Sequence, residues 1–447
     1  MKVLWKHRAS IVFLLVGLGL GFILSGHVVT NVSAVPREDY ESLETFTNIL
    51  SIVKKNYVED VNAKDLISGA INGMLNGLDP HSAYLTPDLY KELQMDTQGR
   101  FGGLGIEITA RNGVLTVVSP IEDTPAYRAG VKAGDQIIKI EDDFTKDMSL
   151  MEAVKRMRGN KGSKVTISIK REGVPELMNF TLVRDVIRVQ SVRSRVLEEG
   201  YGYIRLAQFQ ERTDRDLQRA LEKFSQEKGG LKGLVLDVRN NPGGLLTQAV
   251  RVTDLFLDSG MIVYTDGRLE SQKQKYFAHK EGSWTGFPIV VLVNAGSASA
   301  SEIVAGALQD HKRALILGTK SFGKGSVQTI LPLDDSSALR LTTARYFTPK
   351  GRSIQASGIV PDIVIESTPP PDAKGDERKR PVVREENLPG HLQNQQAPQE
   401  PKDKDKEKEA ERPVPPMSEM TPENDAQLRR ALELLKGWDV FKQVVNK

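Results

Sequence analysis

The stretch VVLVNAGSASASEIVAGA at residues 290–307 specifies the architecture of the second half of the chain. It begins with a β-branched apolar run typical of a buried strand, passes through a turn of small residues, and continues with the apolar periodicity of a helix. Further buried-strand patterns alternate with helical patterns, at 202–206, 214–226, 233–238, 246–257 and 314–318. This alternation predicts an α/β domain with a largely parallel sheet.

Three serines, Ser297, Ser299 and Ser301, lie in the turn of this stretch. Active sites of parallel sheets lie where strands pass into helices, and the N–H groups at a helix start favour an oxyanion. A nucleophilic serine is therefore one interpretation. Simple capping of the helix by these hydroxyls is the alternative.

A second turn, LGTKSFGKGSVQ at 317–328, places Lys324 between two glycines directly after a strand pattern. Flanking glycines allow the backbone to approach closely, and a partly desolvated amine has its pKa lowered toward that of a general base. An ordinary surface turn would explain the same lysine. A third turn, LDVRNNPGG at 236–244, offers glycine N–H groups for an oxyanion hole, or it is only a well-formed strand-to-helix connection.

Competing motifs fit less well. Residues 318–324 have the spacing of a phosphate-binding loop, but Gly325 stands where a Ser or Thr hydroxyl should bind Mg²⁺. Ser321 and Lys324 match S-x-x-K, yet the S-D-N and K-T-G partners of penicillin-recognising enzymes are absent. A histidine-dependent triad lacks the G-x-S-x-G element.

Composition excludes several other functions. The 447 residues contain 61 Lys and Arg against 58 Asp and Glu, a net charge of +3 that is too small for a nucleic-acid-binding field unless the basic residues cluster. Cysteine is absent, so disulfides, thiolate ligands and a cysteine nucleophile are excluded. No two of the six histidines have the i, i+4 spacing of zinc ligands on one helix. We therefore expect no metal and no cofactor.

The N-terminus carries an export signal. Basic residues precede a mostly apolar run at 9–32, and Val32-Ser33-Ala34 offers a cleavage site. Residues 1–34 are thus a cleavable signal peptide or a membrane anchor, and the rest of the chain is exported. In a Gram-negative cell this predicts a periplasmic protein, with attachment to the inner membrane left open.

The remaining segments predict separate domains. Residues 38–96 show the periodicity of two or three helices, and residues 97–183 contain short β-rich runs separated by glycine. Residues 367–421 have the composition of a disordered linker. An amphipathic helix with Thr421 as its cap is predicted within 422–447, as a docking or oligomerisation element.

Taken together, these motifs resemble the carboxyl-terminal processing protease family. The resemblance covers about Tyr40 to Glu366. It rests on an ordered set of strings: GLDPHSAYL at 77–85, GGLGIEI at 102–108, PAYRAGVKAGDQIIKI at 125–140, LDVRNNPGG at 236–244, GSASASE at 296–302 and GTKSFGKGSVQ at 318–328. The resemblance implies an α+β multidomain chain. In it, a PDZ-like β-barrel domain precedes an α/β protease core of ClpP/crotonase type at 184–366.

The resemblance also implies site residues. The nucleophile of a Ser-Lys dyad falls on Ser299, its general base on Lys324, and a glutamine that orients the lysine on Gln328. The backbone N–H groups of Gly244 and Ala300 are the implied oxyanion donors.

The PDZ-like domain would receive a substrate's C-terminal carboxylate at the backbone of 103–106, that is Gly103, Leu104, Gly105 and Ile106, with the peptide added as a strand. Arg158 is a candidate latch between this domain and the catalytic cleft. Protein substrates with free C-termini, homo-oligomerisation through the terminal helices, and a possible adaptor protein are the expected partners. The alternative function is an inactive PDZ scaffold that binds protein tails at the membrane.

Overall fold

The computed structural model describes residues 37–111, 114–146, 148–366, 380–396, 410–411 and 420–445. The predicted signal or anchor at 1–34 lies outside these residues. Within the described ranges, no helix is both long enough and apolar enough to cross a membrane. Two compact units are distinguished, 1–71 and 72–447, and each is treated by itself.

Helices make up the described N-terminal region, as predicted. They are α2 (Arg37–Asn56), α3 (Ala63–Asn76) and α4 (Pro87–Gln98). Helix α4 begins directly after Thr86, because the Thr86 hydroxyl accepts a hydrogen bond from the Leu89 N–H and a proline occupies the first turn. It ends at Gly99, whose φ of 65° is the left-handed conformation that favours glycine.

A small β domain follows, close to the predicted boundaries. Its main sheet has the order β3-β4-β5-β7-β8, with β6 beside β5, and β2 pairs separately with β9. The strands are β2 (Arg100–Gly103), β3 (Ile106–Arg111), β4 (Val114–Pro120), β5 (Gln136–Ile140), β6 (Asp143–Phe144), β7 (Lys164–Lys170), β8 (Met178–Val183) and β9 (Asp185–Arg188). Two short helices, α5 (Pro125–Arg128) and α6 (Leu150–Met157), lie between these strands along the chain. The domain has a separate apolar core, which includes Val117, Ile137 and Ile167.

The predicted α/β core is confirmed by a six-stranded sheet of order β10-β11-β12-β15-β16-β19. These strands are β10 (Val192–Glu198), β11 (Tyr201–Leu206), β12 (Gly233–Asp237), β15 (Ile289–Val293), β16 (Ala314–Gly318) and β19 (Ile363–Val364). All neighbours pair in parallel except β10, which runs antiparallel to β11. The largely parallel sheet thus places the carboxyl ends of β12, β15 and β16 at one edge.

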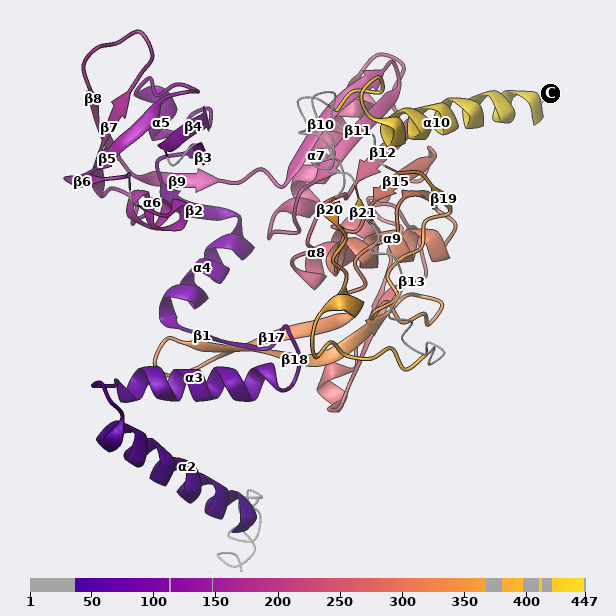
Figure 1. Cartoon of the computed structure of the whole chain (residues 1–447). Helices are drawn as coiled ribbons and strands as arrows, with labels where there is room; N and C mark the ends of the chain where they lie inside the picture. The colour runs from indigo at the N-terminus through magenta and orange to yellow at the C-terminus, as the bar shows by residue number, and fades with distance from the viewer. Residues whose placement is uncertain are drawn as a thin grey trace, which may run out of the picture. The chain divides into compact units, whose positions relative to one another are not determined.

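Helices cover both faces of this sheet (Figure 1). Along β12, Leu234 and Leu236 pack into the core shared with α7 (Thr213–Gln226), α8 (Leu246–Asp254) and α9 (Ala300–Asp310). Val235, pointing the other way, packs into the core shared with the first half of α10 (Ala426–Val445). Because successive side chains of a strand point to opposite faces, both faces must be covered, which explains the continuous apolar runs.

An antiparallel second sheet was not predicted. It contains β1 (Ala83–Leu85), β13 (Met261–Gly267), β14 (Lys275–Phe277), β17 (Ser326–Pro332) and β18 (Ala338–Phe347). Strand β1 belongs to the GLDPHSAYL string at 77–85, which lies within the region predicted to be helical. Asp79 forms the turn before it by accepting hydrogen bonds from the His81 N–H, the Ser82 N–H and the Ser82 hydroxyl.

The predicted linker and terminal helix need correction. Residues 382–396, inside the stretch predicted to be disordered, pack on the core through a 3-10 turn at Glu385–Asn387. Composition did not reveal this, because the contacts are made by isolated polar side chains rather than by an apolar run. Helix α10 begins at Ala426, and its cap is Asp425 rather than Thr421, since Asp425 accepts from the Gln427 and Leu428 N–H groups.

Candidate active site

The three serines of the turn between β15 and α9 have different environments. Ser297 is fully buried and its hydroxyl donates to the Val238 carbonyl at 2.8 Å. Ser301 is also fully buried and donates to the Asn241 carbonyl at 2.9 Å. Ser299, between them, is only half-buried. Two of the hydroxyls therefore fasten the turn, and Ser299 alone remains accessible to a substrate.

Ser299 has a backbone conformation that few residues adopt. Its φ is 55° and its ψ is −113° at the position before α9. A non-glycine residue at positive φ is strained, and such strain occurs where surrounding structure fixes a functional side chain. The Gly243–Gly244 turn packs directly against it, since a Cβ atom at Gly243 would lie 2.8 Å from the Ser299 Cβ. Only glycine allows this approach.

The predicted oxyanion donors lie at the same place. Within the described residues, the N–H groups of Gly244 and Ala300 donate to no backbone or side-chain acceptor. The neighbouring turn is fixed by hydrogen bonds from Phe209 N–H to Gly243 O and from Leu245 N–H to Phe209 O, both 2.9 Å. Two free donors beside a strained serine are the arrangement that stabilises an oxyanion.

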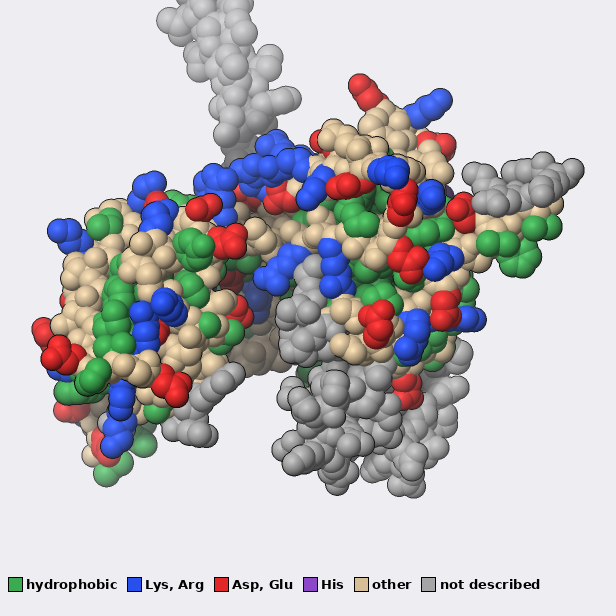
Figure 2. All heavy atoms as spheres, turned by 90° about the horizontal axis from the view of Figure 1, so that it is seen from above, with side chains coloured by type: hydrophobic (Ala, Val, Ile, Leu, Met, Phe, Trp, Pro, Cys, Tyr) green, Lys and Arg blue, Asp and Glu red, His purple; other side chains and the backbone are tan. Residues whose placement is uncertain are grey.

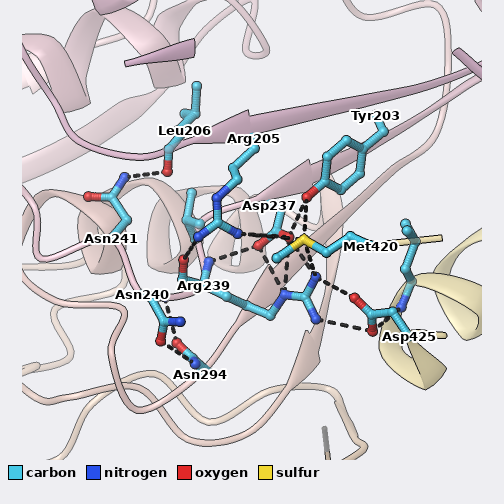
Figure 3. A network of polar contacts seen from close by, with 12 residues as sticks. Tyr203, Arg205, Leu206, Asp237, Arg239, Asn240, Asn241, Asn294, Met420 and Asp425 are labelled. Atoms are coloured by element: carbon cyan, nitrogen blue, oxygen red, sulfur yellow. Dashed lines mark hydrogen bonds and ion pairs between the residues drawn. The ribbon is translucent and has the colours of Figure 1, made fainter. Parts of the chain in front are cut away.

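A buried polar network lies at the end of β12, directly before the turn that contains Gly243 and Gly244 (Figure 3). Asp237, at the end of β12, accepts from Arg239 Nη2 at 2.6 Å, and Asp425 accepts from the same nitrogen at 2.8 Å. Arg205 lies 3.5 Å from Asp237. Arg239 is fully buried, and its charge is balanced by carboxylates from the sheet and from the residue that caps α10. The residue just after it, Asn240, bonds with Asn294 through both backbone and side chain.

Glu302 joins the serine turn to the lysine turn. Its Oε2 accepts from the Ser299 N–H at 2.8 Å and the Lys324 N–H at 2.9 Å. Its Oε1 accepts from the Ser321 hydroxyl at 2.5 Å and the Gly323 N–H at 2.7 Å. Burial raises the pKa of this carboxyl to about 7, although all four hydrogen bonds oppose the shift. One side chain thus fixes the position of both turns.

The environment of Lys324 is as predicted from its glycines. A Cβ atom at Gly325 would lie 2.5 Å from the Gln355 nitrogen, and Gly323 has a φ of 96°. The lysine pKa lies below its ordinary value, mainly because burial penalises the charged amine, with Arg340 acting in the same direction. An amine with a lowered pKa can act as a general base.

Tyr346 connects the same two turns and was not predicted. The residue is buried on β18, and its hydroxyl donates to the Lys324 carbonyl and lies in hydrogen-bonding contact with the Ser299 side chain. Burial raises its pKa well above the ordinary value, so the phenol stays neutral.

Gln328 lies on β17, next to the lysine turn. In the described structure its amide donates to Ser326 at 2.9 Å and to Thr342 at 3.4 Å, and not to Lys324. Thr342 in turn donates to Asp79 at 3.1 Å. Gln328 is therefore linked to the turn that precedes β1.

The predicted peptide-binding and latch residues lie in the small β domain. Gly103 to Ile106 lead into β3, an edge strand of that sheet, which leaves one side of β3 unpaired by the sheet's other strands. Arg158 ends α6, lies 3.3 Å from Glu92 of α4, and stacks over the Phe101 ring with 4.6 Å to its centroid. The contacts of Arg158 are thus with α4 and β2.

The residues that sequence reasoning missed are Glu302, Tyr346, Asp79, His81, Arg340 and Glu385. Only Glu302 and the Asp79–His81 pair stand inside strings that had been singled out, and nothing marked their side chains as part of the site. The others lie far along the chain in unremarkable surroundings.

Comparison with known families gives the class. Residues 200–365 match the model of peptidase family S41, residues 102–194 match a PDZ domain, and residues 25–88 match the N-terminal domain of the activating protease CtpB. A PDZ domain followed by an S41 core defines a PDZ-containing serine peptidase.

Individual relatives narrow the class. A carboxy-terminal-processing protease of Bartonella bacilliformis is 45% identical over 433 residues, 96% of either chain. Carboxy-terminal processing protease CtpA of Bacillus subtilis is 39% identical over 70% of this chain and 67% of its own. A solved photosystem II D1 C-terminal processing protease is 32% identical, covering 74% of this chain and 94% of that one, with a TM-score of 0.42. The chain belongs to the carboxy-terminal processing protease family of serine peptidases, and an inactive scaffold is not favoured.

Proposed function

We propose that the chain cleaves exported proteins at or near their C-terminal tails, with Ser299 as nucleophile and Lys324 as general base. The observation that supports this best is that Glu302 holds the only accessible serine of the turn and the backbone of a lysine with a lowered pKa on one carboxylate oxygen. Neutral Lys324 takes the proton from Ser299 Oγ as that oxygen attacks the peptide carbonyl. The N–H groups of Gly244 and Ala300 receive the developing oxyanion, and water then hydrolyses the acyl-enzyme.

The PDZ domain would select the substrate. An unpaired edge strand preceded by the Gly103–Ile106 loop suits a peptide that adds as a strand and ends with its carboxylate at backbone N–H groups. This arrangement would favour free C-termini and couple their binding to activity.

Export and assembly are further parts of the proposal. The basic and apolar N-terminus supports a periplasmic enzyme that starts from, or stays attached to, the inner membrane. Exposed apolar side chains on α2, including Leu43, Phe46 and Ile49, and on the outer half of α10 support a homo-oligomer.

Hydrolysis of an unfolded protein and of a peptide with a free C-terminus tests the dyad. Ser299→Ala and Lys324→Ala should each lower kcat by at least about a thousandfold while the thermal unfolding midpoint is kept, because either change removes proton transfer from the attacking oxygen. Ser301→Ala is the matched control for Ser299→Ala. It should lower the thermal unfolding midpoint and change kcat much less than Ser299→Ala does. Activity retained in either dyad variant would place the chemistry elsewhere.

A further inference from the structure

Residues 382–396, here called the strap, return to the active site after the core is complete. The strap is anchored on the loop that follows β18: Gln396 Oε1 accepts from the Ser353 N–H at 2.7 Å, and the Leu392 carbonyl accepts from the Gln355 amide at 3.1 Å. These bonds lie at the far end of the strap. The first turn of the strap, which contains Glu385, contacts the lysine turn directly through its backbone.

Hydrogen bonds link Glu385 to the backbone of the lysine turn both before and after Lys324. Its N–H donates to the Phe322 carbonyl at 3.1 Å, two residues before the lysine. Its Oε1 accepts from the Gln355 amide at 2.9 Å, and Oε1 of the same glutamine accepts from the Gly325 N–H at 3.0 Å, one residue after the lysine. The Glu385 side chain is fully buried, so its charge is little screened by solvent.

The turn before β1 supplies another contact of Glu385. Nε2 of His81 lies 2.8 Å from one carboxylate oxygen and 3.0 Å from the other. The His81 carbonyl accepts from Arg340 Nε at 2.9 Å, so this turn is itself fixed on β18. The Glu385 carboxylate thus has partners from two segments, the turn before β1 and the loop after β18, and these hold it in one position.

The charges that face Lys324 come from four elements. They are Glu385 of the strap, Asp79 of the turn before β1, Glu302 of α9 and Arg340 of β18. Among them Glu385 acts most strongly on the lysine, and in the direction that favours the charged amine. Glu302 uses its two oxygens for four other donors, and Asp79 for the turn that it forms. The neutral Tyr346 hydroxyl lies on the Lys324 carbonyl, and His81 lies behind Glu385.

We propose that Glu385 is a positioning residue of the peptidase, the counter-charge that the strap brings to the Lys324 amine. The proposal rests on the assignment of Lys324 as general base. The buried carboxylate, fixed beside the lysine turn, favours the charged form of the amine in the resting enzyme. It also sets the pH above which the amine is free to take the Ser299 proton, because burial alone would leave the amine neutral at lower pH.

The direction of the expected effect follows from charge. A general base must be neutral, so kcat/KM rises with pH through the pKa of Lys324. Glu385→Gln keeps the size of the side chain and removes the charge that favours the protonated amine. An opposite charge within about 4–6 Å shifts a pKa by about 1–3 units. The acid limb of the profile should therefore move to lower pH by about one unit or more, which is about tenfold in kcat/KM at a pH on that limb.

The test is the pH profile of kcat/KM for peptide hydrolysis by the wild type, E385Q and E386Q. Glu386 is the matched control, because the neighbouring carboxylate points to Lys320 at 3.2 Å and is exposed. E386Q should keep the wild-type limb. If the E385Q limb coincides with that of the wild type, the proposal is wrong, even if kcat is lower, because lost packing alone does not move the limb.

Two further outcomes can be distinguished from a failure of this proposal: a variant that does not fold, and a wrong assignment of the general base. If E385Q fails to fold, as shown by its thermal unfolding, E385D replaces it. The same limb must then move in the same direction by a smaller amount, since the charge retreats by one methylene group, and an unmoved limb overturns the proposal. Lys324→Ala with undiminished activity would instead remove the general base itself, and with it the function on which this inference depends.

Discussion

Four hydrogen-bond donors point at the Glu302 carboxylate, and a side chain that replaces Glu302 must accept from all of them. Each carboxylate oxygen receives two donors, so the amide nitrogen of a glutamine would face two donors in either orientation. Glu302→Gln should therefore separate the serine turn from the lysine turn, lowering kcat by at least about a hundredfold and the free energy of unfolding by about 1–3 kcal/mol. Urea unfolding and peptide hydrolysis measure the two effects. Unchanged kcat would show that Glu302 does not position the site.

The pH dependence of stability provides an independent check on Glu302. Burial raises its pKa from 4.5 to about 7, so the folded protein holds this proton more tightly than the unfolded chain. Its contribution to the free energy of unfolding is therefore fully present below about pH 4.5, and is lost as the pH rises to about 7. The loss is about 3 kcal/mol, since one pKa unit is about 1.4 kcal/mol. E302Q should lack this fall, whereas E386Q should keep it.

Single residues could be predicted where the neighbouring sequence shows which backbone conformation and surroundings the residue has. Ser299 and Lys324 lie in small-residue turns after apolar strands, and the glycines around Lys324 report the close backbone approach seen at Gln355. Tyr346 and Glu385 could not be predicted from pattern. Their partners are far apart in sequence, and an alternating strand or a charged linker looks the same whether or not it reaches an active site.

At the scale of elements, a buried ion pair joins the start of α10 to the core, next to the apolar contacts of the helix. Asp425 binds Arg239 and also caps α10 through the Gln427 and Leu428 N–H groups. Asp425→Ala should lower the free energy of unfolding by about 3–5 kcal/mol, because the fully buried Arg239 loses one of its two carboxylates. It should also lower kcat, since Arg239 directly precedes the turn at 240–244, which contains the proposed oxyanion donor Gly244. Denaturant unfolding measures the first effect.

Two variants separate the causes of that loss. Asp425→Asn keeps a side chain that can cap the helix but removes the charge, so most of the cost should remain. Glu433→Ala, which removes an exposed partner of Arg430 on the same helix, should change stability by less than about 0.5 kcal/mol. Equal effects of Asp425→Ala and Glu433→Ala would show that the network does not anchor α10.

Helices and strands could be predicted where their apolar residues recur at a regular spacing. The strands and helices of the core follow the sequence closely, because burial on both faces of the sheet requires unbroken apolar runs. The three-residue strand β1 and the strap were not predictable. Strand β1 has three residues, too few to show a period, and is held by its pairing with β18 and by the Ser82–Thr342 hydrogen bond. The strap is long enough to show a period, but isolated polar side chains hold it, such as Glu385 on Gln355, rather than a periodic apolar face.

At the scale of the whole molecule, α10 combines two surfaces. Its first half is buried on the sheet through Leu428, Leu432 and Leu435. Its outer half leaves Trp438, Val440, Phe441 and Val444 exposed, and Figure 2 shows hydrophobic side chains on this projecting part. The predicted docking role therefore divides in two: the first half docks on its own core, and only the outer half remains available to another chain.

We expect that outer half to bind a second copy of the chain. Protein lacking residues 1–34 should be oligomeric in light scattering at micromolar concentration, and Phe441→Glu should lower its mass, because a buried carboxylate without a partner costs several kcal/mol at an apolar interface. Phe277→Glu is the matched control, since Phe277 of β14 is also exposed but stands apart from α10. If Phe441→Glu leaves the mass unchanged while the wild type is oligomeric, the contact lies elsewhere, and the exposed stripe of α2 becomes the next surface to vary. Because each protomer's α10 also supports Arg239, a loss of kcat that accompanies the loss of mass would show that assembly and the oxyanion turn are coupled through this one helix.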